Sequence, residues 1–136
     1  MAEKFRLELV TPTRHLVSQE VEELTVPGIE GEFGVLPGHT PFLTALGVGE
    51  LTYRIGNEQH FVAVANGFAE VKHEKTTILA EEALFAGEID LREAEAARAA
   101  AEKELEAYSI DSKEYLETQA RLERAMNTIQ VANRRR

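Results

Sequence analysis

The sequence predicts an α+β chain in two parts, an antiparallel β-sandwich or flattened barrel followed by an antiparallel α-helical hairpin. Three observations support this prediction. Up to about residue 87, apolar and polar residues alternate with period two between turn-forming residues. From residue 88 onward, apolar residues recur every three or four positions, and Gly and Pro are absent. The 136 residues, 43% of them hydrophobic, suffice for one core-bearing domain with a small appendage. We therefore expect a sandwich over 1–87 and a hairpin over 88–136.

The first part contains short strands separated by turns. Phe5, Leu7 and Leu9 alternate with polar or smaller neighbours, and a slip in the alternation over 21–26 suggests a β-bulge. Further strand-like segments follow over 51–55, 61–64, 67–71 and 76–80, with a Gly56-Asn57 turn between the first two. Strands this short and this regularly spaced are typical of a sandwich or barrel.

The stretch GEFGVLPGHTPFLT at residues 31–44 holds three glycines and two prolines within an apolar run. This density of helix breakers excludes a helix. We expect short strands joined by tight turns, with Glu32 and His39 on the corners. A docking surface fits this description, and so does a catalytic loop.

The second part begins with a capping-box pattern, in which Asp90 is the N-cap and Glu93 the N3 residue. The pattern is repeated at Asp111, which predicts a second helix after a short loop. The predicted apolar stripe of the first helix is Leu91, Ala94, Ala97, Ala101, Leu105 and Tyr108, and that of the second is Tyr115, Leu122, Ala125, Met126 and Ile129. A buried alanine methyl contributes only about 0.8 kcal/mol, against roughly 1.5–3 for a buried Leu, Ile or Phe. We therefore expect a weak seam that a partner can open, although permanent docking on the sandwich is the simple alternative.

Charge is unevenly distributed along the chain. Residues 1–112 hold nine Lys/Arg against 21 Asp/Glu, a net charge of −12, whereas residues 113–136 hold six against three, a net of +3. This asymmetry indicates a C-terminal segment that meets an acidic surface, and a solvated Arg-rich end explains it equally well. The acidic body argues against a general nucleic-acid binder.

The sequence offers little support for an enzyme. The four histidines show no metal-ligand spacing, and there is neither a cysteine nor a G-x-S-x-G motif. The glycines at 28, 31 and 34 resemble a phosphate loop, but Glu30 and Glu32 would repel a phosphate, and strand-like residues follow them. We expect no metal and no cofactor. The N-terminus lacks a signal-peptide core and no apolar run is long enough to span a membrane, which predicts an intracellular, non-integral protein.

Four motifs together carry a family resemblance. GEFGVLPGHTPFLTAL, NGFAEV, TTILAEEA and the EID start of an alanine-rich helix resemble the epsilon subunit of bacterial F-type ATP synthases over nearly the whole chain. The resemblance implies a ten-stranded antiparallel β-sandwich and two antiparallel helices. It also implies a non-catalytic central-stalk subunit that binds the gamma subunit and the ring of c subunits, with Glu32 and His39 at the c-ring contact.

The resemblance also implies a regulatory tail. In the family the extended hairpin inserts toward the alpha and beta subunits and opposes ATP hydrolysis. The residues implied for this contact are Arg121, Arg124, Arg134, Arg135 and Arg136. Through the complex alone, the chain would be peripheral at the cytoplasmic face of the bacterial inner membrane, coupling proton flow to ATP synthesis.

Some family members hold ATP on the folded hairpin through an I-D-x-x-R-A motif. Ile89 and Asp90 match its start, but Glu93 occupies the arginine position. On the second helix Arg124 matches a phosphate-side arginine. Residual ATP contact would therefore rest on Asp90 and Arg124, and Asp90 is already explained as a helix cap. A freestanding sandwich that binds a small molecule or carbohydrate is the alternative function.

Overall fold

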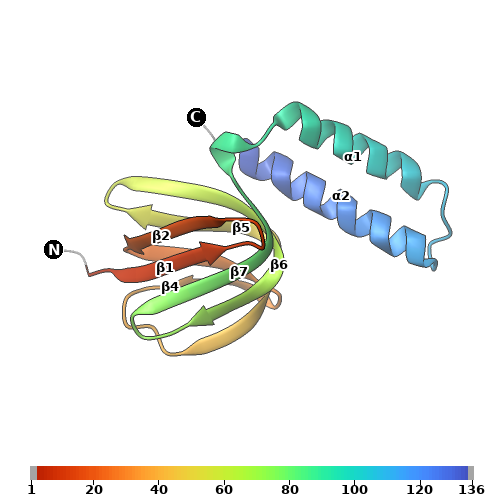
Figure 1. Cartoon of the computed structure of the whole chain (residues 1–136). Coiled ribbons are helices and arrows are strands. Elements are labelled where there is room, and N and C mark those ends of the chain that lie inside the picture. Colours follow the sequence, from red (N-terminus) through yellow and green to blue (C-terminus); the bar gives the residue numbers. More distant parts are fainter. Residues whose placement is uncertain (1–2, 135–136) are drawn as a thin grey trace. The chain divides into compact units, whose positions relative to one another are not determined.

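The computed structural model describes residues 3–134, which form two compact units that divide between Phe85 and Ala86 (Figure 1). The first unit contains only β-strands and their connections, and the second contains the helices. No helix among the described residues is long and apolar enough to cross a membrane.

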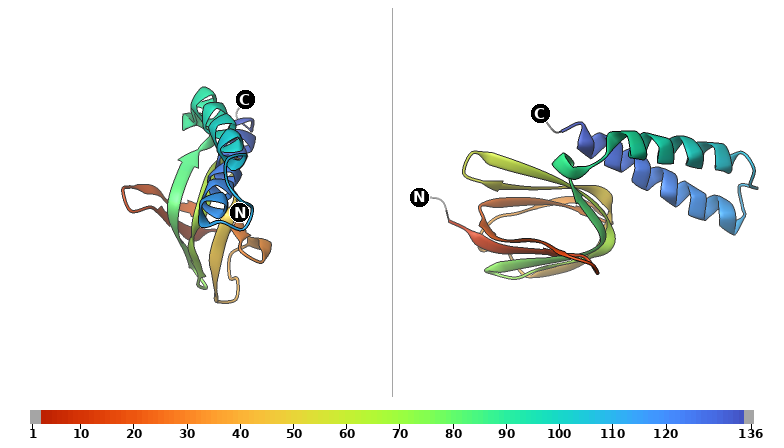
Figure 2. Two further views of the ribbon diagram at one scale, coloured as in Figure 1. Left: turned by 90° about the vertical axis from the view of Figure 1, so that its right-hand side faces the viewer. Right: turned by 45° about the horizontal axis from the view of Figure 1, so that its top comes forward.

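The described residues of the first unit form seven strands in one continuous sheet of order β2-β1-β7-β6-β5-β3-β4. The sheet curls into the two layers of a sandwich (Figure 2). The strands are β1 (Phe5–Val10), β2 (His15–Val21), β3 (Glu23–Gly28), β4 (Gly31–Val35), β5 (Phe42–Ile55), β6 (Glu58–Val71) and β7 (Lys75–Phe85). The predicted sandwich is confirmed, with seven strands in place of the ten that the resemblance implies.

Two features explain the differences from the expected strands. β5 and β6 are each 14 residues long, so segments expected as separate strands form one. β1 also pairs with β7 in parallel, whereas the other ladders are antiparallel. The slip in the alternation over 21–26 is not a bulge within one strand, because β2 ends at Val21 and a new strand, β3, begins at Glu23. An irregularity does occur further along β3, between Thr25 and Gly28, where β3 pairs with β5.

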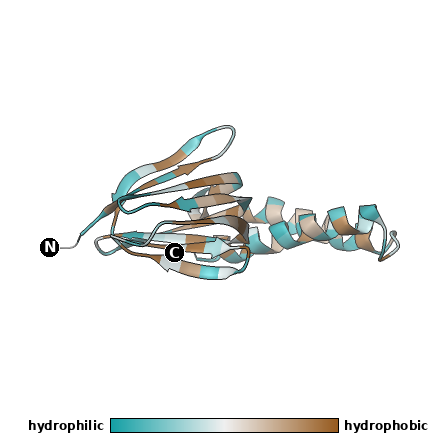
Figure 3. Ribbon diagram, turned by 90° about the horizontal axis from the view of Figure 1, so that it is seen from below, coloured by the Kyte–Doolittle hydropathy of each residue, from teal (hydrophilic) through white to brown (hydrophobic). Residues whose placement is uncertain are grey.

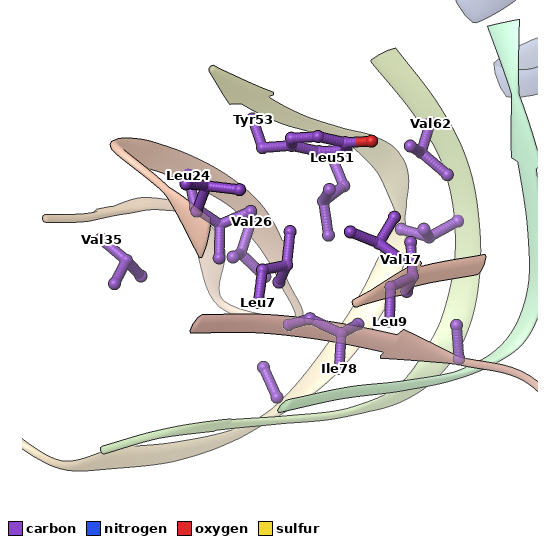
Figure 4. Close-up of a cluster of buried hydrophobic side chains, with 14 of the residues drawn as sticks. Leu7, Leu9, Val17, Leu24, Val26, Val35, Leu51, Tyr53, Val62 and Ile78 are labelled. Atoms are coloured by element: carbon purple, nitrogen blue, oxygen red, sulfur yellow. The ribbon is translucent and has the colours of Figure 1, made fainter. Parts of the chain in front are cut away.

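The core lies between the layers and consists mainly of aliphatic side chains from most strands, together with Phe5 and Tyr53 (Figure 4). Leu7, Leu9, Leu24, Leu51 and Ile78 are all 0% exposed. Hydrophobic and hydrophilic residues alternate along the strands, as the bands of colour in Figure 3 show. Each such side chain contributes roughly 1.5–3 kcal/mol by leaving water, which makes this unit the rigid part of the protein.

Two consecutive residues of β6 adopt positive φ angles, Asn66 at 60° and Gly67 at 126°. A Cβ on Gly67 would lie 1.9 Å from the carbonyl oxygen of Leu79. The buried positions of β6 change parity here, from Val62 and Val64 before the pair to Ala69 and Val71 after it. Glycine is therefore required at residue 67 both by conformation and by space.

The second unit contains a short 3₁₀ helix η1 (Ala86–Glu88) and the helices α1 (Leu91–Leu105) and α2 (Lys113–Ala132). Asp90 caps α1 as predicted, because its carboxylate accepts a hydrogen bond from the backbone N–H of Glu93 at 3.2 Å. The second cap is Ser112 and not Asp111. The Ser112 hydroxyl accepts from the N–H of Tyr115 at 3.0 Å, while Asp111 accepts a bond from the Ser109 hydroxyl.

The seam between α1 and α2 is built from small side chains. Ala94, Ala101, Thr118 and Ala125 are buried. Ala97, Tyr108 and Met126 were predicted in the stripes but are exposed, because α1 ends at Leu105 and the two helices meet along narrower faces. Thr118 takes a seam position that the apolar pattern misses.

A cluster of polar side chains on the outer side of β1 and β2 surrounds Glu8. The Glu8 carboxylate accepts hydrogen bonds from Arg6 Nε at 2.7 Å and Ser18 Oγ at 3.0 Å, and His15 Nε2 lies 2.6 Å away. Chiefly through the bond from Arg6, these contacts lower the pKa of Glu8 to about 2.

The lowered pKa predicts a pH-dependent contribution to stability. The native state holds Glu8 ionised, so its contribution is present above the ordinary carboxyl pKa of 4.5 and is lost as pH falls toward about 2. Glu8→Gln should lower the free energy of unfolding by about 1 kcal/mol at neutral pH, and by less in acid. Urea unfolding at several pH values measures this. Glu20→Gln, at an exposed neighbouring carboxylate, is the control, and an equal loss in both variants would contradict the assignment.

Candidate functional site

The β3–β4 hairpin carries the acidic residue predicted to contact a partner. Its turn is Ile29-Glu30, closed by the Gly28–Gly31 pair, so the predicted place of Glu32 on a corner is wrong. Gly31 adopts a φ of 135°, after which the chain continues as strand β4. Glu32 therefore lies in a strand, opposite Pro27, and is exposed. Within residues 3–134, its carboxylate makes no hydrogen bond or ion pair.

His39 lies in the loop between β4 and β5. Its ring Nδ1 is 2.6 Å from the carbonyl oxygen of Thr40, so the histidine already has a local backbone partner. Phe33 of β4 contacts Phe42 at the start of β5 edge to face, with ring centroids 5.2 Å apart. This contact ties β4 to the end of the loop that holds His39. In the described chain, no hydrogen bond or ion pair joins Glu32 to His39.

An apolar row crosses the outer face of the sheet, and the sequence reasoning missed it. Ala45 pairs with Phe68, Phe68 with Leu79, and Leu79 with Val10, which places these side chains side by side on four neighbouring strands. Ile29 extends the row, because its N–H donates to the carbonyl oxygen of Ala45. We call these five residues the outer apolar row.

Several side chains of the outer apolar row are large and apolar, yet more than half of their surface is exposed to solvent. Ile29 is 65% exposed, Phe68 57% and Leu79 52%, and Leu43 beside the row is 68% exposed. Contiguous exposed apolar side chains of this kind mark an interaction surface. The run Ile78-Leu79-Ala80 could have revealed the row, since a strand with one solvated face should carry a polar residue at its centre.

The predicted tail arginines lie in different surroundings. Arg121 donates two hydrogen bonds to the Glu104 carboxylate, at 2.9 and 3.2 Å, and a third to the Thr118 hydroxyl at 3.1 Å. The Arg121 guanidinium lowers the pKa of Glu104, and the carboxylate raises the pKa of Arg121. Arg124 is half-buried on α2, and Arg134 is exposed just beyond its end. Arg135 and Arg136 lie outside the described residues.

The two residues predicted for residual ATP contact, Asp90 and Arg124, take part in separate local interactions on the hairpin. Asp90 is engaged as the cap of α1, and the backbone carbonyl of Arg124 accepts a bond from the Thr128 hydroxyl at 2.8 Å. No group of three potential metal ligands occurs within residues 3–134. A depression of about 60 Å³ beside Thr25, Thr52 and Arg54 is too small to enclose a sugar.

Both units match models of one family. Residues 4–86 match the beta-sandwich domain of the ATP synthase delta/epsilon chain, and residues 88–133 match its long alpha-helix domain. The ATP synthase epsilon chain of Geobacter sp. (strain M21) is 48% identical over 134 residues, covering 98% of this chain and 97% of the relative. That of Syntrophobacter fumaroxidans is 50% identical over 134 residues, covering 98% and 99%.

Two solved structures share the fold. A chain of the Euglena gracilis mitochondrial ATP synthase, in a structure of OSCP, F1 and the c-ring, aligns with a TM-score of 0.79 at 26% identity, covering 91% of this chain and 78% of that one. A chain from the central stalk and c-ring of the Tetrahymena thermophila enzyme shares the fold, with a TM-score of 0.62 at 13% identity, covering 96% and 98%. The chain therefore belongs to the ATP synthase delta/epsilon chain family, as a non-catalytic epsilon chain.

Proposed function

We propose that this epsilon chain couples rotation of the c ring to the catalytic head, and that its hairpin restrains ATP hydrolysis. The main support is the outer apolar row, an exposed and preorganised docking face on a rigid sandwich. The chain would lie at the cytoplasmic face of the bacterial plasma membrane and be held there only through the complex. Adding it to an enzyme depleted of epsilon should restore proton-coupled ATP synthesis.

The gamma subunit is the proposed partner of the outer apolar row. The row spans four strands that the sandwich core fixes in place, together with Ile29 in the adjoining turn, so little conformational entropy would be lost on binding. Phe68 lies near its centre, between Ala45 and Leu79, where aromatic anchors contribute most to an interface.

Phe68→Glu should weaken binding to isolated gamma by about tenfold or more, because it places a charge at the centre of an apolar contact. Surface plasmon resonance with immobilised gamma measures the change. Leu36→Glu is the matched control, since Leu36 is also 57% exposed but lies outside the row. Equal affinities for wild type and Phe68→Glu would contradict this docking face.

The exposed edge around Glu32 is the proposed c-ring contact. Glu32 is an exposed carboxylate on the edge strand β4, next to a two-residue turn. A carboxylate that no described residue engages is available to the polar loops of a partner, and edge charges steer docking. We assign His39 to the same contact as a secondary residue, because a backbone carbonyl already engages its ring.

Glu32→Lys should impair assembly on the c ring or proton coupling, because it reverses a charge at a close contact. ATP-driven proton pumping in membranes that carry the variant is the measurement. Glu58→Lys reverses an exposed charge at the first residue of β6, next to a different hairpin turn, and should couple normally. Wild-type coupling by the Glu32 variant would show that this edge has been assigned wrongly.

The arginines of the second helix and of the C-terminal end are the proposed contacts to acidic segments of the alpha and beta subunits. Residues 113–136 carry six Lys/Arg against three Asp/Glu, which suits an acidic partner. The small-residue seam makes the hairpin the less stable unit, which suits an element that rearranges.

Truncation after Glu88 removes both helices and leaves the seven-stranded unit intact. ATP synthesis should remain largely coupled, while ATP hydrolysis should rise. Steady-state hydrolysis over a range of ATP and salt concentrations checks this, with full-length chain as the reference. Unchanged hydrolysis throughout that range would exclude an inhibitory hairpin in this protein.

The chain should bind ATP weakly or not at all. Glu93 stands where the ATP-binding motif has an arginine, and it would repel a triphosphate. Calorimetric titration of the isolated chain with ATP should show no dissociation constant tighter than about millimolar, or roughly −4 kcal/mol. Micromolar binding that Arg124→Ala abolishes would reverse this conclusion and make the hairpin an ATP sensor.

A further inference from the structure

Glu104 and Arg121 form an interhelical ion pair with bidentate geometry. Glu104 lies in the last turn of α1 and Arg121 in the first half of α2, 17 residues later in the chain. Two guanidinium nitrogens donate to the two carboxylate oxygens, at 3.2 and 2.9 Å. A planar fork of this kind is the most directional arrangement available to an arginine.

A second contact fixes the same guanidinium. Arg121 also donates to the hydroxyl of Thr118 at 3.1 Å, and Thr118 is only 1% exposed within the helical unit. The other buried residues of the two helices are alanines and one valine, Val131, and their apolar contacts are not directional. The Glu104–Arg121 pair is therefore a specific clasp on an otherwise weakly packed seam.

The Glu104–Arg121 pair also engages the guanidinium that an acidic partner would need. A carboxylate from another chain can form the bidentate contact with Arg121 only after Glu104 has released it. The two side chains remain 41% and 49% exposed, so such an exchange needs little unpacking. Because an exposed pair of this kind is weak, a partner with several carboxylates can displace Glu104.

We propose that Glu104 is an intramolecular competitor for Arg121, holding in the folded hairpin the guanidinium that an acidic segment of a partner subunit binds when the hairpin opens. The proposal rests on the inhibitory role proposed above for the hairpin. Under this proposal Arg121 pairs either with Glu104 in the closed hairpin or with a carboxylate of the partner, but not with both at once. The strength of inhibition then depends on an acidic residue of α1 that touches no partner.

Glu104→Gln should strengthen inhibition of ATP hydrolysis, lowering the amount of chain needed for half-maximal inhibition of an epsilon-depleted enzyme by roughly two- to fivefold. Arg121→Gln should weaken inhibition, and adding Glu104→Gln to it should change nothing further. Glu102→Gln is the matched control, because Glu102 is an exposed glutamate on the same helix. Equal inhibition by wild type and Glu104→Gln would overturn the proposal.

The exchanged pair separates competition from simple clamping of the two helices. Glu104→Arg combined with Arg121→Glu restores an ion pair but presents a carboxylate to the acidic partner. This double variant should keep the hairpin as closed as wild type and still lose inhibition. Wild-type inhibition by a closed double variant would mean that Arg121 does not meet an acidic segment.

Hairpin opening can be measured on the isolated full-length chain, which has no cysteine of its own. Spin labels at Ala100→Cys and Gln119→Cys, both exposed, report the distance between the helices. Glu104→Gln should increase the open population by roughly two- to fivefold, and the exchanged pair should return it to the wild-type value. An unchanged open population in Glu104→Gln would refute the role of the Glu104–Arg121 pair in holding the hairpin closed, even if truncation shows that the hairpin inhibits. If truncation shows no inhibition, the distance measurement remains valid, and only the exchange of Arg121 to a partner is refuted.

Discussion

The antiparallel ladder between β5 and β6 runs along 14 residues of each strand, and the remaining strands are attached to one side of it or the other. β3 and β4 continue the sheet from β5, while β7, β1 and β2 continue it from β6. Because the two long strands belong to both layers, their register sets which residues face the core. The same register aligns Ala45 with Phe68 and hence creates the outer apolar row. The stability of the fold and the alignment of the outer apolar row therefore have one origin.

The periodicity of the sequence was sufficient to predict the two units, because periods of two and of 3.6 residues are local properties. The cap at Asp90 was predictable for the same reason, since donor and acceptor lie three residues apart. Features set by tertiary structure were not predictable in this way. The outer apolar row depends on the alignment of four strands and a turn, and the Glu104–Arg121 pair depends on the register of two helices. Ser112 displaced the predicted cap Asp111 because either residue can begin a helix, and the local hydrogen bonds decided between them.

The two units differ in the kind of interaction that holds them together. Large aliphatic side chains form most of the sandwich core, and their burial does not depend on direction in the way that an ion pair does. The hairpin instead combines a narrow seam of small residues with one oriented ion pair. The stabilisation from buried apolar side chains depends little on salt, whereas that from an exposed ion pair falls with added salt and is lost when another charged group competes for one of its members. This difference suits a subunit in which one part is anchored and the other responds to its surroundings.

The consecutive positive φ angles at Asn66 and Gly67 determine which changes of length this chain tolerates along β6. Because side chains alternate with period two, the parity change at this point keeps valines inward on one side of it and Phe68 outward on the other. Insertion or deletion of a single residue along β6 would exchange the faces of every residue beyond it, burying Phe68 and Glu70 and exposing Ala69 and Val71. The turns at either end of this strand can accept such a change without this exchange, so the exposed position of Phe68 depends on the residue count along β6 as well as on the side chain itself.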